Sequence, residues 1–279
     1  MKQAAEVAAA ARDLPPFPIV AQQVMQLVRS PDSSASDLER VISRDLALTA
    51  RVLKISNSAL YGVRGTITTL SRAVVILGMK TLQSLVIAAS SEAIYRTRNF
   101  KDKLLWDHAL AVALVSRWLA RKKGYRGAEE AFVAGLLHDI GKAVLDLNLP
   151  DRYQEVVQLV YNEGATFLQA ETRLLGFDHA EVGTIVVRKW NLAPGLQEAV
   201  RLHHDPELAR QDPTLCALVC LANAICVRLG VGPERFPELD VSSLPGWQML
   251  EFQNSELPDM LEEIQEKLAA EEDLFGKRI

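Results

Sequence analysis

Apolar side chains recur at helical spacing along almost the whole chain, and this periodicity constrains the fold more than any other feature. In VAQQVMQLV, ALTARVLKI and LAVALVSRWLA, apolar residues return every three or four positions and so line one face of a helix. The period-two alternation of β-branched residues that marks half-buried strands is hard to find. The sequence therefore predicts an all-α fold, a bundle of roughly a dozen short helices.

Capping residues and glycines place several helix ends. Ser36 and Glu39 have the spacing of a capping box, Asp45 is placed to cap a helix that runs through Ile55, and Pro150 opens a further helix. The predicted breaks between helices are Gly62, Gly65, Gly78, Gly124, Gly127, Gly164, Gly176 and Gly230. The polar stretch RTRNFKDK at 96–103 is the predicted seam between two helical halves.

Four segments follow from these boundaries. We expect an N-terminal extension (1–13), an N-terminal helical subdomain (14–100), a second helical subdomain on which the first packs (101–235), and an acidic C-terminal segment (236–279). The last 29 residues carry nine acidic and three basic side chains, which is typical of a solvated helix or tail.

Charge and hydropathy narrow the classes of partner. Residues 1–100 carry 12 Lys or Arg against 7 Asp or Glu, and the remainder carries 19 against 28. This positive balance is spread out and falls short of the clustered basic face of a nucleic-acid binder, so we expect no nucleic acid partner. No apolar run reaches the roughly 18 to 20 residues that span a bilayer. With no convincing leader sequence either, we expect a cytoplasmic protein with no membrane partner.

The three cysteines point to core packing. Cys216, Cys220 and Cys226 form no C-x-x-C pair and lie in the apolar segment LCALVCLANAIC. This setting predicts buried, reduced thiols in place of a disulfide or a zinc site.

The histidines carry the chemical information. The chain has only five, all within one span of about a hundred residues, and one of them opens the His138-Asp139 pair in AGLLHDIGKAV. Neighbours on a helix project about 100° apart, so such a pair reaches one site only from a helix end or between two ions. An Asp in that place is suited to bridging. Imidazole nitrogens with a carboxylate suit Fe, Mn or Zn better than Mg or Ca, and such a centre can generate hydroxide near neutral pH.

A simpler interpretation stands beside this one. Asp139 can be a polar cap where the apolar helix AFVAGLLHD ends at Gly141, and Lys142 a helix C-terminal or surface charge. Taken singly, His108, His179 and His203 fit hydrogen-bonded core histidines better than metal ligands.

Two sets of motifs carry a family resemblance. The pattern H…HD…H…HH with HDIGK resembles the HD superfamily of metal-dependent phosphohydrolases, in particular the branch with the HD-GYP cyclic-dinucleotide phosphodiesterases. LPPFPIVAQQVMQLV, LERVISRDLALTARVLKISNSALYG and ITTLSRAVVILGMKTLQSLVI are similar to the HDOD family, the HD-related output domain of bacterial signalling proteins. The resemblance covers about residues 14–230 and implies a multi-helix HDOD fold whose second subdomain is HD-like.

The resemblance implies roles for individual residues. Asp139 would serve catalysis, and Lys142 matches the lysine that can face substrate phosphate in active relatives. The implied metal ligands are His108, His138, Asp139, His179, His203, His204 and Asn223. Asn223 stands where the HD pattern has its last Asp, and an amide oxygen without charge would hold the ion nearest His108 less tightly.

A second departure concerns the substrate loop. Only 18 residues separate His204 from Asn223, so the long Gly-Tyr-Pro loop of the phosphodiesterase branch is missing. Three functions remain open. The first is a bacterial signal-transduction output protein that acts through protein-protein interaction, with a degenerate site that holds one or two transition-metal ions. The others are a metal-dependent phosphohydrolase of nucleotides or cyclic dinucleotides, and a nucleotide sensor without turnover.

The resemblance favours the first, with signalling proteins as partners and no efficient enzymatic activity. An alternative role for Arg51, Lys54 and Arg64, in the N-terminal subdomain, is a surface for another signalling protein. The simplest role for the apolar positions near them is packing of that subdomain, and those positions are Leu46, Leu48, Val52, Leu53, Ile55 and Leu60.

Overall fold

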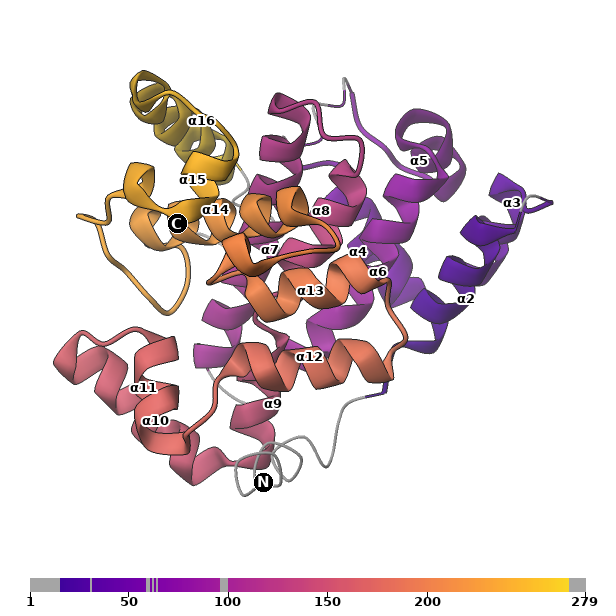
Figure 1. The fold of residues 1–279 in the computed structure, drawn as a ribbon. Helices are drawn as coiled ribbons and strands as arrows, with labels where there is room; N and C mark the ends of the chain where they lie inside the picture. The colour runs from indigo at the N-terminus through magenta and orange to yellow at the C-terminus, as the bar shows by residue number, and fades with distance from the viewer. Residues whose placement is uncertain are drawn as a thin grey trace. The chain divides into compact units, whose positions relative to one another are not determined.

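The structure is a computed structural model that describes residues 16–30, 32–58, 61, 63, 65–95 and 100–270. Helices joined by short turns make up this part of the chain, and no strand occurs in it (Figure 1). The predicted all-α class is therefore confirmed. The chain forms two compact units, one of residues 94–255 and one that combines residues 17–93 with the helix after Glu256. Several predictions fall outside the described residues, namely those for the extension at 1–13, Leu60, Gly62, Arg64 and part of the 96–103 seam.

The unit of residues 17–93 is built from short capped helices. Its helices are α2 (Ile19–Arg29), α3 (Ala35–Ile42), α4 (Leu46–Ser56), α5 (Leu70–Leu77), most of α6 (Met79–Tyr95) and the C-terminal α16 (Leu257–Ala269). Helix α3 packs on α2 and α5, and α4 also packs on α5.

Two helix starts in this unit test the capping predictions. Asp45 accepts a hydrogen bond from the Leu48 N–H at 2.9 Å and caps α4, as predicted. The capping box of α3 is formed by Ser34 and Asp37, so the prediction of Ser36 was wrong. Both serines have the required spacing to an acid, and a start at Ser34 places Leu38 and Ile42 in the core.

The apolar face of α4 is narrower than predicted. Leu48, Val52 and Ile55 are buried, as expected from their spacing of three and four residues. Leu46 is 82% exposed, because two residues before Leu48 is nearly the opposite side of the helix. At the end of α4, the Asn57 amide bonds the Ile67 N–H and C=O at 2.7 and 2.9 Å and so joins two segments ten residues apart.

The unit of residues 94–255 surrounds two long apolar helices. Its helices are α7 (Phe100–Lys122), α8 (Ala128–Leu137), α9 (Ile140–Asn148), α10 (Pro150–Glu163), α11 (Phe167–Leu175), α12 (His179–Lys189), α13 (Pro194–Leu202), α14 (Pro213–Leu229) and α15 (Pro245–Met249). Helices α7, α8 and α14 pack on one another, and α13 contacts α8, α12 and α14. Pro150 occupies the first turn of α10, as predicted.

Helix α14 confirms the cysteine prediction. Cys216, Cys220 and Cys226 are all buried and free. Trp247 of α15 is also buried, and its indole N–H donates to Asn254 Oδ1 at 3.2 Å. None of the described helices combines the length and the apolar character that crossing a bilayer requires.

Close packing of α9 on α12 fixes where the His-Asp pair lies. A Cβ added to Gly141 would lie 1.9 Å from the His179 carbonyl oxygen, so only glycine allows this approach. Because the predicted pair comes just before α9 and His179 begins α12, this contact brings two of the candidate ligand segments together.

Candidate metal centre

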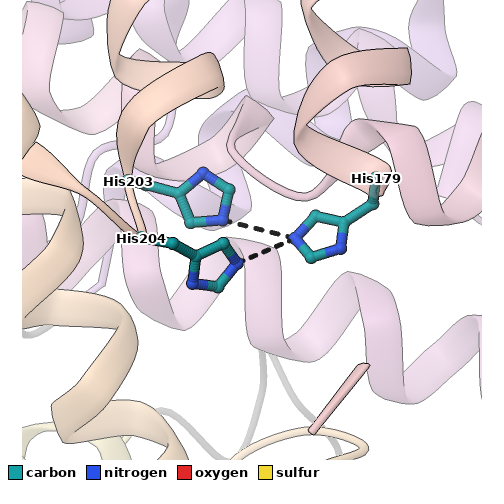
Figure 2. A group of neighbouring side chains, drawn as sticks. All are labelled: His179, His203 and His204. Atoms are coloured by element: carbon teal, nitrogen blue, oxygen red, sulfur yellow. Dashed lines mark hydrogen bonds between the residues drawn. The ribbon is translucent and has the colours of Figure 1, made fainter. Parts of the chain in front are cut away.

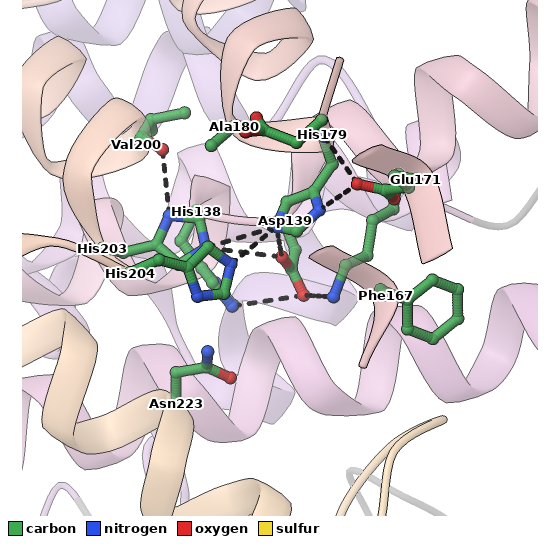
Figure 3. Close-up of polar contacts among 12 residues, drawn as sticks. His138, Asp139, Phe167, Glu171, His179, Ala180, Val200, His203, His204 and Asn223 are labelled. Atoms are coloured by element: carbon green, nitrogen blue, oxygen red, sulfur yellow. Dashed lines mark hydrogen bonds and ion pairs between the residues drawn. The ribbon is translucent and has the colours of Figure 1, made fainter. Parts of the chain in front are cut away.

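Seven predicted ligands from five parts of the helical unit meet in one buried cluster, and Figure 3 labels all of them except His108. They are His108 on α7, His138 and Asp139 between α8 and α9, His179 at the start of α12, His203 and His204 after α13, and Asn223 on α14. Among them only His204 and Asn223 retain partial solvent exposure. The cluster lies entirely within residues 94–255.

The His138-Asp139 pair sits at a helix junction. His138 ends α8, and Asp139 precedes the first residue of α9. The pair thus reaches the cluster from helix ends, as the geometry of adjacent residues requires. The simpler interpretation of Asp139 as a cap was wrong, because its side chain makes no capping hydrogen bond. No helix ends at Gly141 either, since Gly141 is the second residue of α9.

Backbone carbonyls fix the tautomers of three histidines. His108 Nδ1 lies 2.7 Å from the Val231 oxygen, and His138 Nδ1 lies 2.7 Å from that of Gly135. His203 Nδ1 has the same relation to a carbonyl one turn back, at 2.9 Å. A carbonyl only accepts, so each Nδ1 is the protonated nitrogen and each Nε2 lone pair faces the cluster. This arrangement is typical of metal-binding histidines.

Glu171 of α11 holds His179 in the same way. Its Oε2 accepts from His179 Nδ1 at 2.6 Å and from the His179 backbone N–H at 2.8 Å, and Tyr153 donates to its Oε1 at 3.0 Å. Glu171 is fully buried. The sequence interpretation missed Glu171, because it lies outside any His or Asp motif. The available signal was a lone acid on the apolar face of a helix eight residues before a candidate ligand.

The cluster has two halves, one with His108, His138 and Asp139 and the other with His179, His203 and His204. In the second half, three imidazoles converge (Figure 2). His179 Nε2 lies 3.0 Å from His204 Nε2 and 3.4 Å from His203 Nε2. Nδ1 of His203 is protonated, so its Nε2 keeps a lone pair, and the raised pKa of His179 allows His179 Nε2 to carry the proton of this hydrogen bond. A metal cation between the rings would take the place of that proton.

Asp139 lies between the two halves. Its Oδ2 is 3.2 Å from His138 Nε2 and 3.6 Å from His108 Nε2, whereas its Oδ1 is 3.2 Å from His179 Nε2 and 3.8 Å from His203 Nε2. Each oxygen thus faces a different set of imidazoles, which is the geometry of a bridging carboxylate. Oδ1 and His138 Nε2 are buried and lack hydrogen-bond partners.

Lys142 is part of the cluster. The prediction that it is a surface charge or a charge at the C-terminal end of a helix was therefore wrong. It lies in the first turn of α9, is 3% exposed, and donates to Asp139 Oδ2 at 2.8 Å. Its ammonium group also lies 4.7 Å from the centroid of the Phe167 ring. Burial alone would lower the pKa of Lys142, but the charges of Asp139, Glu234 and Glu171 raise it above its ordinary value.

Burial sets the charge of most of the histidines. It lowers the pKa of His108 to about 4 and lowers the pKa of His203 and of His204 well below the ordinary value. For His179, the Glu171 carboxylate outweighs burial and raises the pKa. Burial also opposes ionisation of Asp139, but His138 and Lys142 hold its pKa well below the ordinary value. The cluster is therefore an ionised carboxylate among mainly neutral imidazoles.

These residues fit a bound transition metal. Neutral Nε2 donors, an ionised carboxylate and a buried acid behind His179 are the donor set and supporting contacts that such ions use. Two groups of three side chains have ligand atoms close enough to share an ion: His179, His203 and His204, and His108, His138 and Asp139. Two buried acceptor atoms without hydrogen-bond partners, His138 Nε2 and Asp139 Oδ1, are the observation that supports the fit.

An all-helical unit that gathers scattered histidines around a His-Asp pair at a helix junction defines an HD-type helical domain. The chain belongs to the HDOD domain family, whose sequence model matches residues 14–206. The resemblance to the HDOD family is thereby confirmed. The match begins in the unit of residues 17–93 and continues into the unit of residues 94–255, which holds the cluster.

Solved structures support the same assignment. An HDOD domain protein of unknown function from Geobacter sulfurreducens is 25% identical, with a TM-score of 0.82 over 95% of this chain and 98% of that one. A candidate phosphohydrolase from Shewanella amazonensis SB2B is 27% identical, with a TM-score of 0.78 over 98% of both chains.

Curated relatives are longer proteins. An uncharacterized protein of Treponema pallidum is 26% identical over 80% of this chain and 44% of its own length. Ribonuclease Y of Aquifex aeolicus is 30% identical over 47% of this chain and 18% of its own length. The chain thus spans less than half the length of these two relatives.

Proposed function

We propose that this chain is an HDOD signal-transduction output domain that binds a transition metal in its buried cluster and acts through protein-protein interaction. One observation supports metal binding. On His108, His138, His179 and His203, a hydrogen bond anchors Nδ1, and Nε2 on the other side of the ring faces the ionised Asp139. Fe, Mn and Zn suit this mixture of imidazole and carboxylate.

Several features favour a structural or sensing role for the ion over turnover. His138, Asp139, His179 and His203 are at most 1% exposed, which leaves little room for a substrate beside the ion. Lys142 is committed to Asp139, so it does not present a free ammonium to a phosphate. Asn223 supplies no charge where the HD pattern has an acid, which weakens the activation of a metal-bound water.

Elemental analysis tests the metal-binding half. The chain is purified without a histidine tag or added metal, and we expect at least one Fe, Mn or Zn ion per chain; less than about 0.2 would refute metal binding at ordinary affinities. Asp139→Asn should remove the ion. Asp151→Asn, an identical change on the exposed side of α10, is the matched control and should keep it.

Crosslinking in the source cells tests the interaction half. A signalling protein crosslinked to the N-terminal unit should be lost on Lys54→Glu, which reverses an exposed charge on α4. Lys189→Glu, on the exposed end of α12, is the control and should retain it. Equal crosslinking in both variants would refute an interaction surface around Lys54.

A phosphohydrolase is the second candidate, favoured by the likeness to the Shewanella protein. The partial likeness to ribonuclease Y adds RNA to the substrates worth testing, against the expectation of no nucleic acid partner. Bis(p-nitrophenyl) phosphate, a cyclic dinucleotide and a short RNA would be assayed with Mn²⁺. Turnover that Asp139→Asn abolishes would replace the output role with an enzymatic one. Calorimetric binding of the dinucleotide without turnover would favour the third alternative, a nucleotide sensor.

A further inference from the structure

The two halves of the cluster differ in which groups their ligand atoms contact. In the half formed by His179, His203 and His204, the Nε2 atoms face one another, and Asp139 Oδ1 has no hydrogen-bond partner. In the other half, Asp139 Oδ2 accepts from Lys142 and His108 Nε2 meets the Asn223 amide. Only His138 Nε2 is left without a partner there.

The contact between His108 and Asn223 removes a ligand in either protonation state. Asn223 Oδ1 lies 3.0 Å from His108 Nε2, and His108 Nδ1 already donates to Val231. If the imidazole is neutral, Nε2 carries a lone pair, and half a turn of the amide about its Cβ–Cγ bond brings the Nδ2 donor to it. If the imidazole is a cation, Nε2 carries a proton and donates to Oδ1. In both cases the contact uses the atom that would bind a metal.

An aspartate at position 223 would act differently. A carboxylate only accepts, so it cannot donate to the His108 lone pair and would leave that lone pair for an ion. Asn223 is therefore more than a weaker ligand, because its N–H group competes with the metal for His108.

Lys142 supplies the charge that a second ion would otherwise bring. Its ammonium group lies 2.8 Å from Asp139 Oδ2, on the side of the carboxylate that faces His138 and His108. A divalent ion at this position would have to displace the ammonium group or share the oxygen with it, against like-charge repulsion.

The other half has the dimensions of one four-coordinate ion. Bonds of about 2.0 to 2.1 Å in a tetrahedron separate the ligand atoms by about 3.3 to 3.4 Å. The distances from His179 Nε2 to the other Nε2 atoms are 3.0 and 3.4 Å, and those from Asp139 Oδ1 to His179 and His203 are 3.2 and 3.8 Å. His179 Nε2, His203 Nε2 and Asp139 Oδ1 thus lie at nearly the separations that three ligands of one ion require, and His204 Nε2 lies 3.0 Å from the first of them.

We infer that this chain holds a single ion, bound by His179, His203, His204 and Asp139, and that the Asn223 amide keeps His108 out of coordination. This inference rests on the proposed metal-binding function. It departs from the ligand set implied by the resemblance, in which His108 and Asn223 also bind metal.

Ion stoichiometry separates the inference from the function on which it rests. Wild-type chain loaded with Mn²⁺ and desalted should hold close to one ion and show the resolved hyperfine pattern of isolated Mn²⁺ in its electron paramagnetic resonance spectrum. Two ions with an exchange-coupled spectrum would overturn the inference and leave metal binding intact. Less than about 0.2 ions would overturn metal binding itself.

A matched pair of variants locates the ion. His108→Ala and His204→Ala make the same change in opposite halves, and circular dichroism checks that each variant is folded. We expect His108→Ala to keep the ion and His204→Ala to lose it. Loss of the ion from folded His108→Ala, or its retention in His204→Ala, would contradict the assignment.

The role of Asn223 has its own test. Asn223→Asp should raise the Mn²⁺ content from about one ion toward two and introduce the spectrum of a coupled pair. Asn162→Asp makes the same substitution at an exposed position of α10 and should leave the content unchanged. A content that stays at one ion in Asn223→Asp would refute the claim that the amide blocks the second position.

Discussion

Glu171 Oε2 lies 2.6 Å from Nδ1 of His179 and 2.8 Å from its backbone N–H, so one buried carboxylate fixes both the ring and the main chain of a metal-ligand candidate. The first bond holds the proton on Nδ1 and makes Nε2 a better electron-pair donor to a metal ion. The second places His179 at the start of α12. Glu171 is thus a positioning residue that acts on an ion through His179.

Glu171→Gln should weaken metal binding about 10- to 100-fold, the range found for outer-shell partners of metal-ligating histidines. The glutamine keeps the size of the side chain but removes its charge, so His179 becomes a poorer donor. Competition with a fluorescent chelator measures the affinity. Glu163→Gln removes an equivalent charge from an exposed ion pair with Arg173 and should change nothing. Equal affinities for the two variants would refute the positioning role of Glu171.

Gly141→Ala should disrupt the centre without touching a ligand. The added Cβ would lie 1.9 Å from the His179 carbonyl oxygen, which forces α9 and α12 apart. Overpacking of this kind costs about 1 to 3 kcal/mol, and the displaced His179 should lose its ion. Urea denaturation and metal analysis measure the two effects. Gly195→Ala is the control, because its Cβ would meet nothing closer than 3.5 Å. A Gly141→Ala protein with wild-type stability and metal content would contradict the close approach.

The helical class could be predicted because periodicity is a local pattern, whereas the gathering of the histidines was implied by the family resemblance. Periodicity identified the helices, and the His-Asp pair with its scattered histidines identified the cluster. The choice between Ser34 and Ser36 as the start of a helix could not be decided, because two possible capping boxes overlap and the one formed is compatible with burial of Leu38 and Ile42.

Contacts that no sequence motif specifies hid the rest of the site. Nothing in the sequence around Lys142 indicates that it is buried. Lys142 contacts Asp139 only because the junction between α8 and α9 turns both side chains inward. Glu171 reaches His179 through the turn between α11 and α12, and no motif specifies that contact. The difference between the two halves of the cluster depends on the contact of Asn223 with His108, which lie 115 residues apart, and no spacing in the sequence specifies that contact.

Asn57→Ala should destabilise the N-terminal unit and leave the metal content unchanged. The Asn57 amide makes three hydrogen bonds, to both backbone groups of Ile67 and to the Leu53 carbonyl. At a net value of about 0.5 to 1.5 kcal/mol each, their loss should cost about 2 kcal/mol for this partly exposed side chain. Urea denaturation measures the change, with Asn162→Ala on exposed α10 as control. A loss of metal in Asn57→Ala would show that the centre depends on this unit.

The metal-free protein should lose stability as the pH falls from about 6.5 to about 4, because the unfolded chain takes up protons there that the folded chain refuses. Burial lowers the pKa of His108 from 6.5 to about 4 and shifts His203 and His204 the same way. At about 1.36 kcal/mol per pH unit between the two pKa values, His108 alone accounts for about 3 kcal/mol. The raised pKa of His179 acts in the opposite direction, since its contribution is fully present below pH 6.5 and is lost as the pH rises through the folded value.

Three lowered values against one raised value give a net loss in acid. Urea denaturation of chelator-treated protein at about pH 7.5 and about pH 4.5 measures it, and His108→Gln should flatten the dependence because the glutamine does not titrate. Asp139, with its pKa below 3.8, adds to the loss only at still lower pH and so does not contribute within this window. Equal stability at the two pH values would mean that the buried imidazoles already carry protons in the folded chain, and the neutral donor set on which metal binding depends would then be wrong.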